Sequence, residues 1–178
     1  NETIDSINFV KKISEIIIDI KQKIKKRTLI LCTSYKQINL FKDLLDKKNK
    51  KNIFYQNNYT SKQNLLKKYL SYSDSVLFGT NTFWEGIDLP NDYLEVLIIL
   101  KLPFSNPNSP IVNAKIDYYN MKNLEPFYDY QIPETILKLK QGIGRLIRND
   151  NDAGVCIITD PRMIIKNYGR FIIDSLPV

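Results

Sequence analysis

TLILCT, residues 28–33, is a short and nearly continuous apolar run, and residues with helical spacing follow it at Ile38, Phe41, Leu44 and Leu45. A run of this length without polar alternation is typical of a strand that a parallel sheet buries on both faces. The spacing that follows fits one apolar side of an amphipathic helix. The stretch therefore predicts a strand that leads directly into a helix.

The same order of strand and helix recurs along the chain. Ser61 can cap a helix that carries Leu65 and Tyr69, and a long amphipathic helix over about residues 3–26 precedes the first strand. Further strands are predicted at 52–56, 75–80, 93–102 and 154–159, with 93–102 the longest. Strands separated by helix-length segments predict crossover connections. We expect an α/β fold with an open, mainly parallel sheet and helices on both faces.

The amino-acid composition limits the number of domains, the chemistry and the partners that this chain can have. The chain has 178 residues, 43% of them hydrophobic, enough for one large or two small domains with a sizeable core. It contains no histidine, which excludes Ser-His triads and His-ligated zinc. The net charge of +7 favours a polyanionic partner such as nucleic acid, although solvated lysine-rich faces give the same charge without a partner.

Cys32 and Cys156 lie inside apolar runs and lack CxxC spacing. We expect both to be reduced core residues rather than a disulfide or metal pair, which favours a cytoplasmic protein. No apolar run approaches ~20 residues and no signal peptide opens the chain, so we expect no membrane partner. The chain begins with Asn1 rather than Met, and we expect it to be part of a longer protein.

QGIGRLIR, residues 141–148, holds two of the five arginines. An apolar stripe with helical spacing leads into it at Ile132, Ile136, Leu139, Ile143, Leu146 and Ile147. At about 100° per residue, Gln141, Arg145 and Arg148 gather on the side opposite this stripe. Most such faces are solvated, but two glycines within a helix cost roughly 1 kcal/mol each relative to alanine and indicate close approach by a backbone or a ligand.

Polar residues follow the predicted strands at the edge where α/β sheets bind ligands. Thr33 and Ser34 follow the first strand and can donate hydroxyls to phosphates, although Ser34 also fits a helix cap. The stretch GTNTFWEGIDLP, residues 79–90, follows the third strand. An ordinary turn explains part of it, with Gly86 for a positive φ and Asp88 as a cap.

These stretches resemble a known family. QGIGRLIR resembles motif VI of superfamily 2 helicases, GTNTFWEGIDLP is similar to motif V of their DinG/XPD (Rad3-like) branch, and TLILCTSY (28–35) lies where motif IV is expected. The resemblance covers most of residues 28–177 and includes the closing YGRFIIDSLP. It implies that residues 1–178 form one RecA-like C-terminal motor domain of an ATP-dependent DNA helicase, with 5′ to 3′ polarity expected.

The resemblance also implies roles for single residues on the nucleotide side. Arg145 and Arg148 fit arginine fingers, which hold positive charge against the γ-phosphate. Gln141 lies at the domain interface in the family, so it is assigned to coupling. Gly86 and Asp88 are assigned to the cofactor, through close approach to the nucleotide and contact with the ribose or the partner lobe.

On the nucleic-acid side, the resemblance assigns Thr80 to the backbone of single-stranded DNA, together with the hydroxyls of Thr33 and Ser34. Within the same motif, core packing is favoured over base stacking for Trp84. Glu85 is assigned to structural or interdomain contacts, because no metal-binding motif lies near it.

The chain lacks parts of an ATPase site. It contains neither GxxxxGK[ST] nor an Asp-Glu pair of the kind that holds magnesium. We therefore expect ATP and Mg²⁺ to be held mainly by the first RecA-like domain of the same polypeptide, with no metal in this chain, and the isolated chain to be inactive.

Two other functions stay open from the sequence. A non-enzymatic nucleic-acid-binding α/β domain fits the charge and the aromatic residues Tyr118, Tyr119, Phe127 and Tyr128, because bases stack on such side chains. It does not explain the GRxxR pattern. An independent nucleotide-dependent enzyme fits the alternating pattern but lacks a phosphate loop and histidine.

Overall fold

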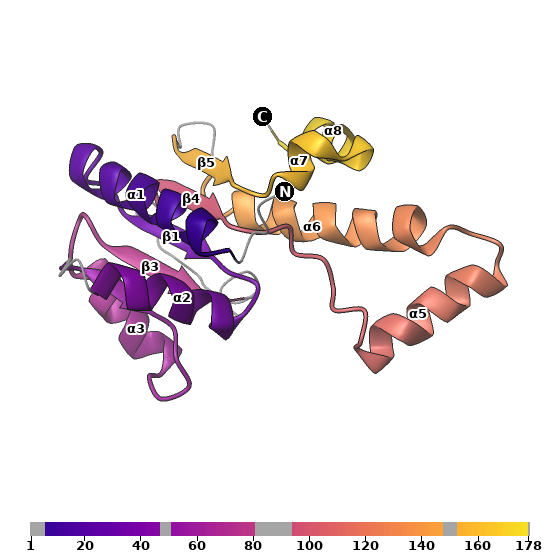
Figure 1. Ribbon diagram of the computed structural model, residues 1–178, viewed down its shortest axis with the longest axis horizontal. Helices are drawn as coiled ribbons and strands as arrows, with labels where there is room; N and C mark the ends of the chain where they lie inside the picture. Colours follow the sequence, from indigo (N-terminus) through magenta and orange to yellow (C-terminus); the bar gives the residue numbers. More distant parts are fainter. Residues whose placement is uncertain (1–5, 47–50, 81–93, 148–152, 178) are drawn as a thin grey trace.

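The computed structural model describes residues 6–46, 51–80, 94–147 and 153–177, and it contains one five-stranded parallel sheet (Figure 1). Its spatial order is β2-β3-β1-β4-β5. The strands are β1 (Thr28–Leu31), β2 (Ile53–Tyr55), β3 (Val76–Gly79), β4 (Val96–Ile99) and β5 (Val155–Ile158). The predicted α/β class with a mainly parallel sheet is confirmed.

The central strand β1 is paired on both sides. Leu29 lies opposite Leu77 of β3 and Leu97 of β4, and every residue of these three strands is buried. Continuous apolar runs suit such strands because neither face meets water.

One predicted strand was too long. We expected a strand over 93–102, whereas β4 spans only Val96–Ile99. Leu100 and Leu102 stay buried after the strand has ended. The apolar run therefore continues past the residues that pair with neighbouring strands.

Two helices cover one face of the sheet. They are α1 (Ile7–Lys23), which Ser6 caps by accepting the N–H of Phe9 at 3.2 Å, and α2 (Tyr35–Asp46). The apolar sides of both helices pack on the strand residues Ile30, Phe78 and Ile98. This face buries the amphipathic helix that the N-terminal sequence pattern predicts.

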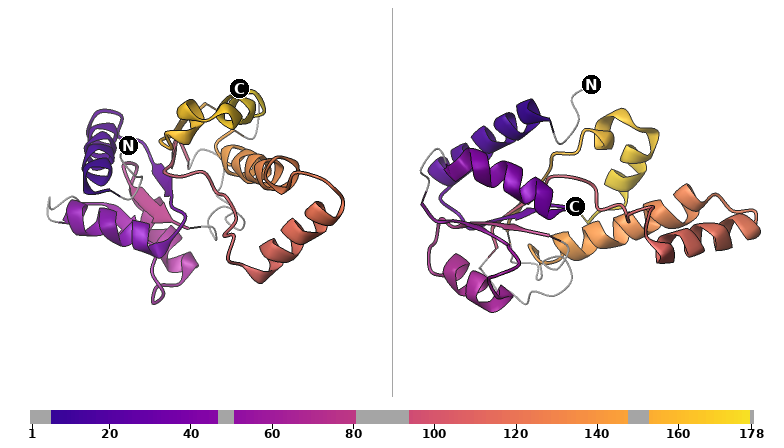
Figure 2. Two further views of the ribbon diagram at one scale, coloured as in Figure 1. Left: turned by 45° about the vertical axis from the view of Figure 1, so that its right-hand side comes forward. Right: turned by 60° about the horizontal axis from the view of Figure 1, so that its bottom comes forward.

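The opposite face is covered by α3 (Lys62–Leu70), α6 (Ile132–Ile143) and α8 (Asn167–Asp174), which follows the short helix α7 (Arg162–Ile165). Their buried residues form a second core with Leu29, Leu77 and Leu97. Helices lie on both faces, as predicted (Figure 2).

A helical hairpin extends beyond the sheet. Helix α5 (Pro110–Met121) and the π-helical turn η1 (Phe127–Gln131) lead into α6, whose first turns project away from the strands (Figures 1 and 2). Tyr119 stacks on Tyr130 with ring centroids 5.6 Å apart. Along the described ranges, no helix combines the length and apolar character needed to cross a membrane.

Helix α6 ends earlier than the apolar stripe predicts. It stops at Ile143, and Gly144 begins a turn in which the N–H of Leu146 donates to the Ile143 carbonyl at 2.8 Å. Leu146 is buried, so the stripe persists through the turn, but Ile147 is 46% exposed. The predicted helix was therefore too long, because the chain changes from α-helix to tighter turns after Ile143. The predicted clustering of Gln141, Arg145 and Arg148 stays a prediction, since Arg148 lies outside the described residues.

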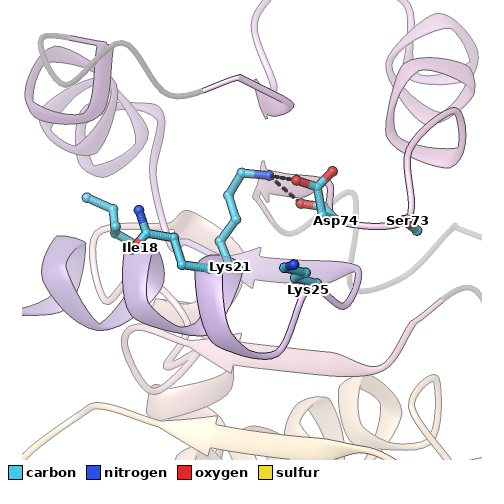
Figure 3. A pocket seen from close by; sticks show the side chains of 6 residues that line it. Ile18, Lys21, Lys25, Ser73 and Asp74 are labelled. Atoms are coloured by element: carbon cyan, nitrogen blue, oxygen red, sulfur yellow. Dashed lines mark hydrogen bonds and ion pairs between the residues drawn. The ribbon is translucent and has the colours of Figure 1, made fainter.

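Lys21 ties the end of α1 to the start of β3. Its ammonium donates to the backbone carbonyl and to a carboxylate oxygen of Asp74, each at 2.6 Å, beside a cavity of about 390 Å³ (Figure 3). The amide of Asn52 donates to the other carboxylate oxygen at 2.8 Å. Burial alone would raise the pKa of Asp74, but the hydrogen bonds from Lys21 and Asn52 hold it below its ordinary value.

We predict that Lys21→Met lowers the free energy of unfolding by about 2 kcal/mol, since the substitution keeps an apolar stem and leaves Asp74 without its cation. Lys23→Met is the matched control, because Lys23 and its partner Asp19 are both largely exposed and such pairs contribute roughly 0.5 kcal/mol. Urea unfolding of both variants measures the difference. Equal losses would show that Lys21 contributes no more than a surface charge.

The same pair sets a pH dependence. The folded-state pKa of Asp74 is below its unfolded value, so its contribution is present above the ordinary carboxyl pKa and is lost as pH falls through the lowered folded value. Relative to wild type, the deficit of Lys21→Met is therefore expected to shrink in acid, below roughly pH 4.

Candidate functional site

The parallel strands bring several polar residues to one edge of the sheet. Thr33 and Ser34 follow β1, Gln56 follows β2, and Thr80 follows β3. Ligands of α/β sheets bind outside the carboxyl ends of the strands. The predicted nucleic-acid-binding residues therefore share the edge of the sheet that suits a binding site.

Thr80 is buried and bonded within the protein. Its backbone N–H and its hydroxyl both donate to Oε1 of Gln56, at 2.7 and 3.0 Å, and Nε2 of Gln56 donates to the hydroxyl of Tyr35 at 2.9 Å. The Thr80 hydroxyl proton is engaged with Gln56, so a direct donation to phosphate requires that bond to break. Sequence reasoning missed Gln56, although its place at the end of a predicted strand was a signal.

Ser34 and Thr33 differ in what they can still donate. Ser34 is exposed and its Oγ accepts the N–H of Gln37 at 3.2 Å, so it caps α2 and keeps its hydroxyl proton free to donate. Thr33 is half-buried, and its N–H donates to Oε1 of Gln37 at 3.2 Å. Gln37 is buried and orders this corner, a role that its place in the first turn of a predicted helix did not reveal.

Arg145 lies in the turn after α6 and is half-buried, whereas Gln141 is exposed in the last turn of α6. The structure brings Arg145 near Lys62, at the start of α3. Burial lowers the pKa of Lys62, and the positive charge of Arg145 lowers it further. Two cations from segments far apart in sequence thus share one region. Nothing in the sequence around Lys62 predicted that it lies near Arg145.

Three predicted site residues, Gly86, Asp88 and Arg148, lie outside the residues that the structure describes. Trp84 and Glu85 also fall in that part of the chain. Their predicted roles stay predictions.

Both cysteines are free, and neither is set up as a reactive thiol. Cys32 is fully buried, and burial raises its pKa far above the ordinary thiol value. Burial raises the pKa of Cys156 to about 11. High pKa values keep both thiols protonated at neutral pH. In the described ranges no group of three or more Cys, Asp or Glu side chains is placed to hold a metal ion.

An ion pair between a buried carboxylate and a half-buried guanidinium fixes the loops beside the edge. Asp160 follows β5 and is 2% exposed; it accepts the N–H of Leu102 at 2.8 Å and two side-chain hydrogen bonds to Oδ2 from Arg162, at 3.1 and 2.6 Å. Burial would raise the pKa of Asp160, but the bonds from Arg162 and Leu102 lower it. The guanidinium also lies 5.2 Å from the ring centre of Phe104. The pair therefore anchors the loop that follows β4.

The helicase C-terminal domain family matches residues 17–178. That is nearly the whole chain, including all five strands. The chain belongs to the helicase C-terminal domain family.

Relatives within the family are similar over most of this chain. It is 39% identical over 173 residues to the ATP-dependent DNA helicase YoaA of Haemophilus influenzae. This alignment covers 97% of this chain and 27% of that protein. It is 41% identical over 157 residues to the ATP-dependent DNA helicase DinG of Photobacterium profundum, covering 84% of this chain and 22% of that protein. The chain therefore spans less than a third of the length of either relative.

Solved structures share the fold. A structure titled XPD helicase superposes with a TM-score of 0.69 at 21% identity, over 96% of this chain and 31% of that one. A second, titled as apo XPD, gives a TM-score of 0.72 at 18% identity, over 95% of this chain and 35% of that one. The resemblance to the DinG/XPD branch and the RecA-like fold that it implied are thus confirmed.

We predict that Asp160→Asn lowers the free energy of unfolding by about 3 kcal/mol, because the partly buried guanidinium of Arg162 loses its counter-charge. Asp174→Asn is the matched control, since Asp174 and Arg170 form an exposed pair at 3.7 Å, which is expected to contribute roughly 0.5 kcal/mol. Thermal and urea unfolding measure both. A loss for Asp160→Asn no larger than the control would remove the anchoring role.

Proposed function

We propose that this chain is the C-terminal motor lobe of an ATP-dependent DNA helicase, and that it works with a first RecA-like domain of the same polypeptide. One observation carries the proposal, namely the family match over residues 17–178. The relatives named as ATP-dependent DNA helicases support it, because the similarity extends along most of the chain rather than one motif.

On the nucleotide side, Arg145 supplies positive charge to the γ-phosphate of ATP bound at the first domain. ATP supplies the phosphoryl group that is transferred to water. An arginine delivered across a domain interface stabilises the charge of the transition state and is worth about 10³ to 10⁵ in rate. Half-burial of Arg145 with Lys62 nearby supports this role, since a partly desolvated cation acts more strongly on an anion.

The other nucleotide-side residues keep the roles that the family resemblance implies. Arg148 acts as a second finger, Gln141 couples the two lobes, and Gly86 and Asp88 approach the nucleotide or the first lobe. The exposure of Gln141 supports contact with another domain. Mg²⁺ is held by the first domain, because this sequence has no phosphate loop and no Asp-Glu pair.

On the nucleic-acid side, Ser34 and Thr33 donate to the backbone of single-stranded DNA, and Thr80 joins them when its bond to Gln56 opens. Their shared place at the carboxyl ends of β1 and β3 supports one continuous contact line. The net charge of +7 adds a sequence-independent attraction that weakens as salt rises.

Because the chain holds only one part of the proposed ATPase site, we predict that the isolated 178 residues show no DNA-stimulated ATP hydrolysis above a buffer blank. It lacks the phosphate loop and the magnesium ligands that such turnover needs. A phosphate-release assay with and without single-stranded DNA measures it. Robust turnover by this chain alone would overturn the assignment to one lobe.

A further prediction tests Arg145 as an arginine finger, through the substitution Arg145→Lys in the full-length helicase. DNA-stimulated turnover is expected to fall by about 10²-fold or more while ATP binding is kept, because a charge remains but the planar, bidentate donor is lost. Steady-state hydrolysis and binding of a labelled ATP analogue measure the two effects.

Arg170→Lys is the matched control, because Arg170 lies on the exposed side of α8. Its turnover is expected to stay near wild type. Normal turnover in Arg145→Lys would remove the finger role, and a large fall in its melting temperature would make Arg145 a structural residue instead.

A further inference from the structure

The order of the sheet creates a crevice between β1 and β4. These strands are neighbours, but β1 connects through α2 towards β3 and β2, whereas β4 connects through α5 and α6 towards β5. Helix α2 covers one face of the sheet and α6 the other. Where neighbouring strands diverge in this way, a crevice opens at their carboxyl ends.

A cavity of about 290 Å³ lies at this place. Thr33 lines it from the end of β1, the loop after β4 lines it from Pro103 to Asn106, and Lys138 lines it from α6. Figure 1 shows the loop after β4 leaving the sheet towards α5. We call this cavity the switch-point pocket. No site residue assigned above, other than Thr33, contributes to it.

The wall of the switch-point pocket is held in shape by the fold. The buried carboxylate of Asp160 fixes the N–H of Leu102 where the loop begins. Phe104 stacks on Phe127 with ring centroids 5.8 Å apart, and Ser109 N–H donates to the carbonyl of Asn106 at 3.0 Å. A site ordered before binding loses little entropy when a ligand arrives.

The pocket presents one cation with hydroxyl groups around it. Lys138 Nζ donates to Ser105 Oγ at 2.7 Å and lies 3.6 Å from Glu134 Oε2, which accepts from Ser105 at 2.5 Å. An ammonium carries three hydrogens, so a donor remains for a ligand. Ser109 precedes α5 without making a side-chain capping bond, and no acidic residue lies in the first turn of α5.

This chemistry fits a singly charged oxyanion with an apolar neighbour. Glu134 partly offsets Lys138, so a multiply charged triphosphate would meet too little positive charge. A phosphodiester carries one negative charge, and its sugar can lie against Pro103, Phe104 and Val112 in the wall. Thr33 joins the pocket to the proposed DNA contacts at the ends of β1 and β3.

We propose that the switch-point pocket binds one phosphodiester of single-stranded DNA, with Lys138 as its charged donor and Ser109 as a neutral donor. This assignment rests on the proposed function and extends the DNA path from Thr33 onto the loop before α5 and onto α6.

The test compares Lys138→Gln with Lys140→Gln in the full-length helicase. Both remove one charge from α6, but Lys140 is exposed and does not line the pocket. Binding to labelled oligothymidine is measured across a salt series. Lys138→Gln is expected to weaken binding roughly tenfold at fixed salt and to reduce the slope of log affinity against log salt by about 0.7, one phosphate contact on a single strand.

Lys140→Gln is expected to change the slope little. Equal effects of the two variants would show a general charge effect and overturn the pocket. An unchanged salt slope in Lys138→Gln would do the same.

Ser109→Ala tests the pocket without changing charge or removing a bond of the fold, and roughly threefold weaker DNA binding is expected. It also keeps the proposal testable if Lys138→Gln has a much lower melting temperature than wild type. A labelled ATP analogue should bind Lys138→Gln as tightly as wild type, and a selective loss of nucleotide binding would overturn the phosphodiester assignment. If wild-type protein binds no single-stranded DNA, the proposed function fails; if wild type binds and both pocket variants match it, only the pocket fails.

Discussion

The burial of β1 on both faces and both edges is the constraint on which the rest of the structure depends. Its four residues are fully buried and pair with β3 and β4 in parallel register. A strand enclosed in this way accepts a polar side chain only where that side chain gains a partner within the protein. In β1 this holds for Thr28 alone, at the start of the strand, whose hydroxyl donates to the carbonyl of Lys26 at 3.2 Å. Polar groups of the central strands therefore collect just beyond their ends, at Thr33, Ser34 and Thr80, and this sorting concentrates potential binding groups along one edge.

Sequence predicted the sheet well because buried parallel strands leave a local signal. The apolar runs located all five strands, and helical spacing located α1, α2, α3 and α6, but not α7 and α8. Boundaries were less accurate where packing continues beyond regular structure. Leu100 and Leu102 stay buried after β4 has ended, and Leu146 stays buried after α6 has ended. Apolar periodicity reports burial, and burial does not require a strand or a helix.

The candidate site was less predictable because its geometry depends on contacts distant in sequence. Arg145 was found through its motif, but nothing near it in the chain indicates that Lys62 lies close to it. The bond from Thr80 to Gln56 joins residues 24 apart in sequence, and Asp160 orders a loop 58 residues away. Such pairings are set by the strand order β2-β3-β1-β4-β5, which a single sequence does not determine.

The strand order also separates the contacts proposed for the two ligands. Helix α3 follows β2, and Lys62 in its first turn lies near Arg145. The proposed nucleotide contact of Arg145 therefore lies near the start of α3. The proposed phosphodiester contacts lie between β1 and β4, where the connections diverge. The rigid strands between these places are buried and closely paired, so a displacement imposed at one place is transmitted as movement of the lobe rather than absorbed inside it. Such stiffness suits the motor-lobe role proposed above.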